Sequence, residues 1–371
     1  MSDTNIQLMR QSLHEKTQHT QNAHPGLLLQ RGLPEWETGV KTAKENLIRR
    51  IADIPVPDED SLYGLAFDRW VKHTADPKRF HSLCVAVEGR LYTGLGTSDA
   101  LETGITVHHT YGMPILPGSS IKGATAAYAE NIGIPTAVSN ILFGSETESG
   151  ALVWHDAWWI PTKNSAHPFV KEIVTTHHQE YYKGDRSMPD RLEQPMPNRQ
   201  IATQGGFYFL VEAAPDAGAW AEFAVNLLAQ MLENQGMGSK TSSGYGYFDT
   251  QDPYNPYQKY VDNKKEAALA VAEQAQTAAL SPHEQLIAKW LKIIQGEKKY
   301  NVGDNEGSQY FKELETDLKQ AATDGRLSSQ DRQQITEQLA LKPVLQKHQP
   351  NWLTSKREKS IKELLKALQN N

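Results

Sequence analysis

Tyr111-Gly-Met-Pro-Ile-Leu-Pro-Gly-Ser-Ser-Ile-Lys-Gly-Ala124 and Gly236-Met-Gly-Ser-Lys-Thr-Ser-Ser-Gly-Tyr-Gly246 are the two stretches around which this chain is organised. In the first stretch, two prolines and a glycine indicate a turn, and the Ala-rich run over 121–130 is compatible with a helix. Ser119 or Ser120 is suited to cap that helix, because a hydroxyl oxygen accepts a hydrogen bond from a free amide of the first turn. The stretch therefore predicts a loop that opens into a helix.

Both stretches have properties that favour an anion. A helix start presents free backbone N–H groups and the positive end of the helix dipole, and Lys122 in the first turn adds a full charge. The second stretch combines four glycines with hydroxyl side chains and Lys240 within eleven residues, so its backbone is able to approach a ligand closely. We therefore expect both stretches to contact a phosphodiester backbone.

Other interpretations of these stretches stay open or fail. Lys122 could instead be a solvated lysine on an exposed first turn. The glycine loop could instead be only a tight helix-to-strand connection, since helix ends favour glycine. Gly118 and Gly123 have the spacing of a P-loop, but no lysine follows them. The dinucleotide fingerprint fails where Asp99 and Thr241 take the place of its third glycine. No cofactor is therefore expected.

The composition is that of a globular protein, with 371 residues, a net charge of −6 and one cysteine, Cys84. A single cysteine excludes an intramolecular disulfide and fits a reducing cytoplasm. The chain has no apolar run of about 20 residues that would span a membrane, and residues 1–30 contain no apolar signal segment. We therefore expect a cytoplasmic protein with no membrane partner, in which a local basic groove is compatible with the acidic net charge.

The pattern of elements predicts an α+β core followed by helices. We expect strands over 80–92, 151–160, 169–176, 206–213 and 245–249, and helices over 42–51, 61–73 and 220–233, while the polar segment 177–204 shows no period. The order of strand, helix, strands, helix and strand is that of the ferredoxin-like fold with long insertions.

Four regions follow from this pattern. We expect residues 1–77 to form short helices that pack on the core and, over 1–35, either a poorly ordered polar arm or a segment that a partner orders. We expect 78–250 to form the core, 251–262 a linker and 263–371 a helical C-terminal extension. The extension has three interpretations, which are a docking module for other subunits, a second RNA-contacting element and an oligomerisation bundle. We favour subunit docking, because its mixed charges are typical of solvated helix faces.

The motifs together resemble the signature of the RAMP superfamily of CRISPR-associated proteins. The resemblance is carried by Thr93-Gly-Leu-Gly-Thr, by the stretch over 111–123, by Leu142-Phe-Gly and by the glycine loop over 236–246. Within that superfamily, His177-His-Gln-Glu-Tyr-Tyr-Lys-Gly-Asp185 ahead of Phe207-Tyr-Phe-Leu resembles the sixth subunit of the type III-B (Cmr) effector complex. The resemblance covers residues 78–250 and leaves the C-terminal extension unassigned.

This resemblance implies a ferredoxin-like (RRM-like) core in a ribonucleoprotein that carries a CRISPR RNA and recognises complementary target RNA in antiviral defence. The resembled subunit lies near the 3′ end of the guide, caps the filament of backbone subunits and is not the nuclease. Base pairing reads the sequence in such complexes, so the protein needs to hold the backbone and shape of the RNA. We therefore expect a non-catalytic RNA-binding subunit whose partners are CRISPR RNA, target RNA and the other subunits.

The polar segment after residue 176 is a third candidate for RNA contact. Tyr181 and Tyr182 are suited to stack on bases, and Lys183, Arg186 and Arg199 are suited to meet phosphates. The alternatives are a surface loop with locally packed tyrosines and a subunit interface. The predicted RNA-binding residues are Ser119, Ser120, Lys122, Tyr181, Tyr182, Lys183, Arg186, Arg199, Gly236, Gly238, Ser239, Lys240, Thr241, Gly244 and Gly246.

The alternative function is a RAMP endoribonuclease that processes precursor CRISPR RNA. Candidate acid–base groups near neutral pH are His81, His108, His109, His177 and His178. Their spacing singles out no catalytic residue, and adjacent histidines in an extended segment point to opposite sides. The chain contains no H-E-x-x-H, so no metal site is expected either.

Overall fold

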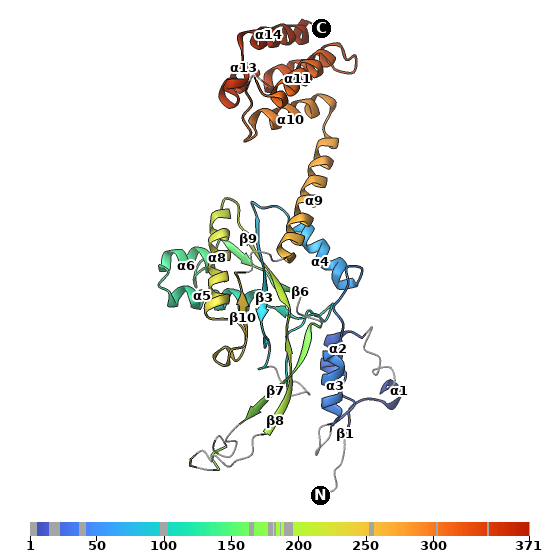
Figure 1. The fold of residues 1–371 in the computed structure, drawn as a ribbon, viewed down its shortest axis with the longest axis vertical. Helices are drawn as coiled ribbons and strands as arrows, with labels where there is room; N and C mark the ends of the chain where they lie inside the picture. The colour runs from blue at the N-terminus through green and yellow to red at the C-terminus, as the bar shows by residue number, and fades with distance from the viewer. Residues whose placement is uncertain are drawn as a thin grey trace. The chain divides into compact units, whose positions relative to one another are not determined.

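The structure is a computed structural model that describes residues 6–14, 23–36, 42–96, 103–162, 167–176, 181, 183–185, 187–188, 196–251, 256–301, 303–339 and 341–370. The chain divides into two compact units, Met1–Ala268 and Leu269–Asn371. The first unit combines an antiparallel sheet with helices, and the second unit is helical among its described residues (Figure 1). A mixed α and β chain with a helical C-terminal region is therefore confirmed.

A central antiparallel sheet organises the first unit. Its strands are β3 (Phe80–Glu88), β4 (Ile115–Leu116), β5 (Leu152–Trp154), β6 (Ala157–Ile160), β9 (Gly206–Ala213) and β10 (Tyr247–Asp249). They lie in the order β10-β3-β9-β6-β4, and β5 also pairs with β9. Strand β9 is apolar from Gly206 to Val211 because both faces of the sheet are covered there. This burial explains why its predicted bounds agree with the structure.

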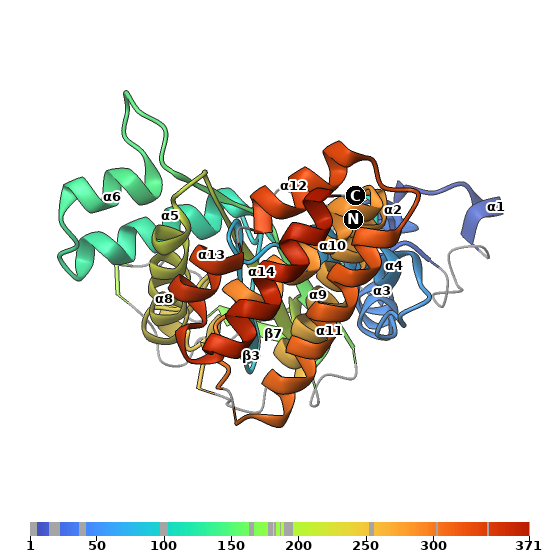
Figure 2. The same ribbon diagram turned by 90° about the horizontal axis from the view of Figure 1, so that it is seen from above.

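Three helices cover one face of the sheet. They are α5 (Gly118–Asn131), α6 (Thr136–Phe143) and α8 (Gly218–Asn234), which lie together beside β3 and β10 in both views (Figures 1 and 2). Phe207 and Phe209 of β9 pack on this side, against a core that includes Leu228 and Met231 of α8. Helix α6 was not predicted, because its short apolar run shows no helical period.

The opposite face is covered by α4 (Leu62–His73) and by the start of α9 (Pro256–Ala279). Phe67 of α4 and Val261 of α9 pack against Cys84 and Tyr208 of the sheet. A linker was expected over 251–262, but a helix begins at Pro256 and Val261 is fully buried. Proline is well tolerated in the first turn of a helix, so a proline-rich segment is compatible with a helix start as well as with a linker.

The N-terminal region is more ordered than predicted. Strands β1 (Ile6–Gln7) and β2 (Glu35–Trp36) pair with each other, and α1 (Gln11–His14) and α2 (Pro25–Arg31) lie between them in sequence. A poorly ordered arm over 1–35 is wrong for α2, whose Leu28 and Leu29 belong to the main hydrophobic core. Burial of these leucines stabilises a helix too short to form alone. Helix α3 (Thr42–Ala52) agrees with its prediction to within one residue.

A two-stranded ribbon extends from the core. It is formed by β7 (Phe169–Thr176) and β8 (Met196–Thr203), which pair along their whole length (Figure 1). Strand β7 was predicted, whereas β8 lies in the segment that showed no period. Only the inner half of β8, from Gln200 to Thr203, is buried, so an alternating pattern has no physical reason to develop along its outer half.

The second unit has its own hydrophobic core. It contains α10 (Pro282–Gln295), α11 (Asn305–Thr323), α12 (Ser329–Leu339), α13 (Leu341–His348), a 3-10 turn η3 (Pro350–Trp352) and α14 (Ser355–Asn370). Trp290 and Trp352 are fully buried, and the Trp352 indole donates a hydrogen bond of 2.6 Å to the Gly307 carbonyl. The buried Gln349 amide donates to the Ile294 and Lys298 carbonyls. Among the helices of the described ranges, none combines the length and apolarity that crossing a membrane requires.

Candidate nucleic-acid interface

The glycine loop that connects α8 to β10 folds back on residues 90–92. Ser239 donates its backbone amide to the Tyr92 carbonyl at 2.9 Å, and Gly246 donates to the Arg90 carbonyl at 2.9 Å. A Cβ on Gly238 would lie 2.3 Å from the Tyr92 oxygen, and one on Gly246 would lie 2.0 Å from the Met237 oxygen. These glycines also adopt positive φ, as does Gly236. The fold itself therefore requires these three glycines, as a tight helix-to-strand connection would.

The apex of the loop is different. Lys240 has a φ of 62° and begins a 3-10 turn, η2 (Thr241–Ser243), which ends at Gly244. A Cβ on Gly244 would meet no atom within 4 Å, and the Lys240 side chain is exposed. A lysine in the left-handed region costs about 1–2 kcal/mol and persists only where the surrounding structure fixes it. The loop thus holds one ammonium group outward on a rigid turn.

Below the apex, the buried Tyr92 joins the loop to the ribbon. The rings of Tyr92 and Tyr245 lie 4.9 Å apart, and burial raises the pKa of the Tyr92 hydroxyl, with the neighbouring Glu172 carboxylate acting in the same direction. The Arg90 guanidinium donates to the Lys171 carbonyl at 2.9 Å and to the Glu172 carboxylate at 2.5 Å. Tyr92 therefore stays neutral, and Arg90 fixes the base of the ribbon beside the loop.

Basic side chains continue along the ribbon. A cavity of about 420 Å³ lies between α3 and the ribbon, and its charged lining residues are Glu45, Arg49, Lys171, Glu172 and Arg199. Arg199, predicted as a phosphate contact, forms an ion pair of 3.2 Å with Glu45, and both side chains are about half exposed. Sequence reasoning missed Arg49, Arg90 and Lys171, since nothing in their local pattern shows that the fold gathers them.

The start of α5 has other surroundings than the motif suggested. The N-cap is Pro117, and neither Ser119 nor Ser120 caps the helix, so that expectation is wrong. Proline offers no side-chain acceptor, and Asp156 supplies one instead by accepting the Gly118 amide at 2.7 Å. Ser119 and Ser120 are exposed in the first turn, and Lys122 is partly buried. A carboxylate of the protein itself therefore occupies this helix N-terminus.

The structure does not bring the two stretches together. The start of α5 lies against Trp154, since a Cβ on Gly118 would be 2.1 Å from the Trp154 carbonyl oxygen. Trp154 and His81 both pair with Val211 of β9, so the start of α5 lies near the His81 end of β3. The glycine loop enters the sheet where Tyr247 pairs with Glu88. His81 and Glu88 are seven residues apart on β3, which is roughly 20 Å of strand. The stretches therefore lie near opposite ends of the sheet.

Of the polar segment after β7, only part lies in the described residues. The Tyr181 side chain is 40 % exposed, and Lys183 is also exposed. Tyr182 and Arg186 lie outside the described residues, as do the paired histidines His177 and His178. Their predicted contacts with RNA stay predictions.

Comparison with known proteins fits this arrangement. Residues 85–249, which run from β3 through the ribbon and the glycine loop to β10, match the RAMP superfamily. The matched segment, which is somewhat less than half of the chain, is similar to the RAMP superfamily. The match ends before α9, in agreement with a resemblance that leaves the C-terminal extension unassigned.

Two curated relatives of this chain are Cmr6 subunits. The Cmr6 subunit of the CRISPR Cmr system of Pyrococcus furiosus is 23 % identical over 286 residues, covering 59 % of this chain and 82 % of the relative. The Cmr6 subunit of Saccharolobus solfataricus is 27 % identical over 170 residues, covering 44 % of this chain and 56 % of the relative. The resemblance to the sixth Cmr subunit is therefore confirmed.

A solved structure also resembles this chain. A chain of the type III-B Cmr-beta complex bound to cognate target RNA has a TM-score of 0.47 and 20 % identity, covering 56 % of this chain and 71 % of that one.

Of the histidines proposed for a RAMP endoribonuclease, His81 and His108 are partly buried, whereas His109 is exposed. The His108 ring lies 4.6 Å from that of Tyr111 and 5.2 Å from that of Trp158, and burial lowers its pKa although Asp156 opposes this. Burial also lowers the pKa of His81, whose Nε2 has no hydrogen-bond partner among the described residues. Within the described ranges, no group of three or more His, Cys, Asp or Glu side chains is placed to hold a metal ion.

Proposed function

We propose that this protein is a Cmr6-like subunit of a type III-B CRISPR effector complex. In this proposal it holds the 3′ region of the CRISPR RNA, caps the filament of backbone subunits and does not cut RNA. The observation that carries the proposal is the set of cations on the glycine loop, on the ribbon and its base, and on the neighbouring helix α3, which are Lys240, Arg90, Lys171, Arg199 and Arg49. The match to the RAMP superfamily and the two Cmr6 relatives support it.

We infer that the core is ferredoxin-like. Strands β3, β6, β9 and β10 lie in the order β10-β3-β9-β6, with α5 after β3 and α8 after β9 in sequence. In an RRM, bases stack on an open face of such a sheet. Here α5, α6 and α8 cover one face, and α4 and α9 cover the other. The RNA therefore lies along the glycine loop and the ribbon in our proposal, and not on the sheet.

The charges at this edge fit a phosphate backbone. Glu45 and Glu172 partner two of the arginines, but both ion pairs are partly exposed, and exposed pairs contribute only about 0–1 kcal/mol. A phosphate offers each guanidinium a stronger acceptor geometry at little cost. These carboxylates thus orient the arginines without competing strongly for them. The local excess of positive charge lies in a chain whose net charge is −6.

The proposal differs from the endoribonuclease alternative in that this protein does not cleave RNA. An acid–base mechanism needs a group within hydrogen-bond reach of the transferred proton. In the described part of the chain, His81 and His108 are partly buried and packed, and His155 is hydrogen-bonded to Glu212 at 2.8 Å. These contacts support a structural role for these three histidines.

The first experiment is a titration of the full-length protein with a single-stranded CRISPR RNA, followed by fluorescence anisotropy across a range of salt concentrations. We expect binding that weakens steeply with salt, because each phosphate contact releases counterions. The same RNA is run on a denaturing gel. A discrete product would establish the endoribonuclease instead, and salt-independent binding would contradict a phosphate interface.

Assembly needs its own measurement. Co-expression with the other subunits of a type III-B complex should yield one particle that contains this chain and a CRISPR RNA, with this chain at the end of the filament. Omission of this chain should shorten the protected 3′ region of the guide. A guide that is protected to the same length without this chain would contradict the proposed position.

A further inference from the structure

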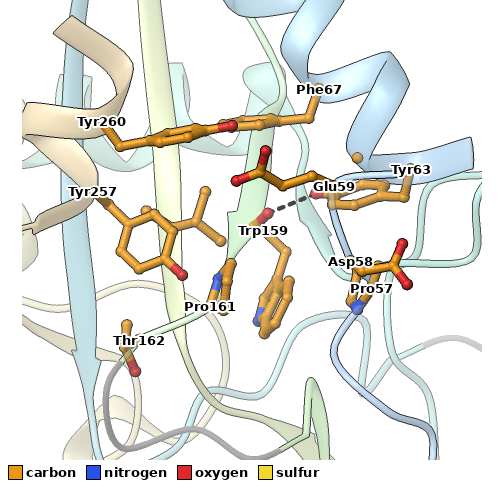
Figure 3. A pocket seen from close by; sticks show the side chains of 12 residues that line it. Pro57, Asp58, Glu59, Tyr63, Phe67, Trp159, Pro161, Thr162, Tyr257 and Tyr260 are labelled. Carbon is orange, nitrogen blue, oxygen red and sulfur yellow. Dashed lines mark hydrogen bonds between the residues drawn. The ribbon is translucent and has the colours of Figure 1, made fainter. Parts of the chain in front are cut away.

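A cavity of about 470 Å³ lies beside α4 and the first turns of α9, and it shares no lining residue with the proposed RNA interface. Aromatic side chains surround it, namely Tyr63 and Phe67 of α4, Trp159 of β6, and Tyr257 and Tyr260 of α9 (Figure 3). Its volume lies within the range of about 300–1,000 Å³ that is typical of ligand sites.

One carboxylate points into this aromatic cavity. Figure 3 shows the Glu59 carboxylate between the rings of Phe67 and Tyr260 and that of Trp159, whereas the Asp58 carboxylate points away. The backbone that carries both residues is fixed on the first turn of α4, since a Cβ on Gly64 would lie 2.3 Å from the Asp58 oxygen and 2.6 Å from the Glu59 oxygen. The cavity thus has a positioned acceptor.

The walls of the cavity are also fixed. The Tyr63 hydroxyl donates a hydrogen bond of 2.7 Å to the Trp159 carbonyl, and Tyr63 is buried. The rings of Tyr63 and Phe67 stack at 6.5 Å. Aromatic rings that are held in place attract cations through the negative potential of their faces.

The charge of the segment before α4 favours a cation over a phosphate. Between Ile51 and Asp68 the chain has no lysine or arginine, and it has five carboxylates, which are Asp53, Asp58, Glu59, Asp60 and Asp68. The Lys264 ammonium of α9 lies 5.2 Å from the centroid of the Tyr260 ring, which shows that this ring accepts a cation. Asp68 is paired with Lys72 and Lys264, whereas Asp58, Glu59 and Asp60 are exposed. Such a field repels nucleic acid and attracts a cation. An exposed carboxylate among aromatic faces suits a guanidinium group, because the flat guanidinium stacks on aromatic rings and pairs with a carboxylate.

We propose that this cavity receives an arginine side chain of a partner protein, with the guanidinium stacked on Tyr260 and Phe67 and paired with Glu59. A protein partner fits the rest of α4, where Leu62 and Leu65 are 80 % and 51 % exposed. Two exposed leucines three residues apart on a helix suit the apolar part of a protein interface. The proposal is independent of RNA binding at the other site.

The test uses the full-length protein and two short peptides, acetyl-Gly-Arg-Gly-amide and its citrulline counterpart, in saturation-transfer NMR titrations. Citrulline keeps the shape of arginine and lacks the charge. We expect the arginine peptide to bind at least tenfold more tightly than the citrulline peptide, and Glu59→Gln and Tyr260→Leu to weaken it by about tenfold. Asp58→Asn is the matched control and should change its affinity less than twofold, because that carboxylate points away.

Three outcomes would overturn the proposal. They are equal binding of the two peptides, equal loss in the Glu59→Gln and Asp58→Asn variants, and displacement of the arginine peptide by a single-stranded RNA in a manner that depends on Tyr260. Circular dichroism of each variant establishes that it is folded. Since Glu59 is exposed, Glu59→Gln leaves the fold intact and keeps the test decisive.

Discussion

The two ends of the central sheet carry loops of similar composition in opposite surroundings. At one end, the start of α5 combines glycine, two serines and Lys122, and the Asp156 carboxylate accepts a hydrogen bond from the first amide of the helix. At the other end, the glycine loop combines glycine, hydroxyl side chains and Lys240, and arginines and a lysine lie beside it. The same residue types thus form a closed junction at one end and an open basic edge at the other.

This difference shows what turns an anion-friendly motif into an anion site. Free amides at a helix start attract an anion only where the protein does not satisfy them itself. The Asp156 carboxylate is covalently part of the chain, so a phosphate at α5 has to displace it. At the glycine loop, the exposed apex and the ribbon leave room for a ligand. The comparison yields four predictions, from the largest effect to the smallest.

The first prediction concerns the glycines of the open end. Gly246→Ala should lower the free energy of unfolding by about 3 kcal/mol, because its Cβ would lie 2.0 Å from a backbone oxygen at a positive φ. Gly244→Ala at the apex should cost only about 1 kcal/mol, since it has positive φ but open space. Urea unfolding followed by circular dichroism measures both. Equal losses would show that the loop does not fold back on residues 90–92 as described.

The second prediction tests the closed end. Asp156→Ala should destabilise the protein by about 1–2 kcal/mol, because the Gly118 amide loses its acceptor. Asp156→Asn is the matched control, since its amide oxygen still accepts the bond, and it should cost less than half as much. Thermal unfolding of the two variants measures this, and RNA affinity should be unchanged in both. A weaker RNA complex would place RNA at the α5 start after all.

The third prediction contrasts the two lysines. Lys240→Glu should reduce the slope of log affinity against log salt by about one, because one phosphate contact is lost, whereas Lys122→Glu should leave the slope unchanged. Lys319→Glu, an exposed lysine of the second unit, controls for net charge. Anisotropy titrations with the CRISPR RNA measure the slopes. Equal slopes for Lys240→Glu and Lys319→Glu would remove the glycine loop from the interface.

The fourth prediction concerns pH at the closed end. Burial alone would raise the pKa of Glu212, but hydrogen bonds from Arg79 and His155 outweigh it and hold that pKa below the usual 4.5. A lowered pKa in the folded state means that the stabilisation is present above pH 4.5 and is lost as the pH falls through the folded value. The effect should be below about 1 kcal/mol, because the Arg79 side chain is more than half exposed.

Urea midpoints at pH 6 and pH 3.5 test this for the wild type and for Glu212→Gln. The variant should lose less stability than the wild type on acidification. A parallel loss in the two proteins would show that Glu212 makes no net contribution there.

Several features of the fold were readable from the sequence because local physics sets them. Helix α4 begins within one residue of its predicted start, and the Ser61 side chain accepts the Gly64 amide at 3.0 Å. Strand β9 has a continuous apolar run from Gly206 to Val211 because it is buried on both faces there. By contrast, β8 is held by backbone pairing with β7, which leaves no pattern in its side chains. Helix α2 depends on contacts with residues far along the chain, which its own composition does not record.

The sequence by itself determined the RAMP motifs, the glycines that the loop needs and the helical character of the C-terminal extension, because these follow from residues that are neighbours in the chain. Only the tertiary structure decided which loop is open. Asp156 lies 38 residues from the amide that it accepts, and Arg90 lies 82 residues from Glu172. Strand register sets both distances, and register arises from pairings between segments that are far apart in sequence.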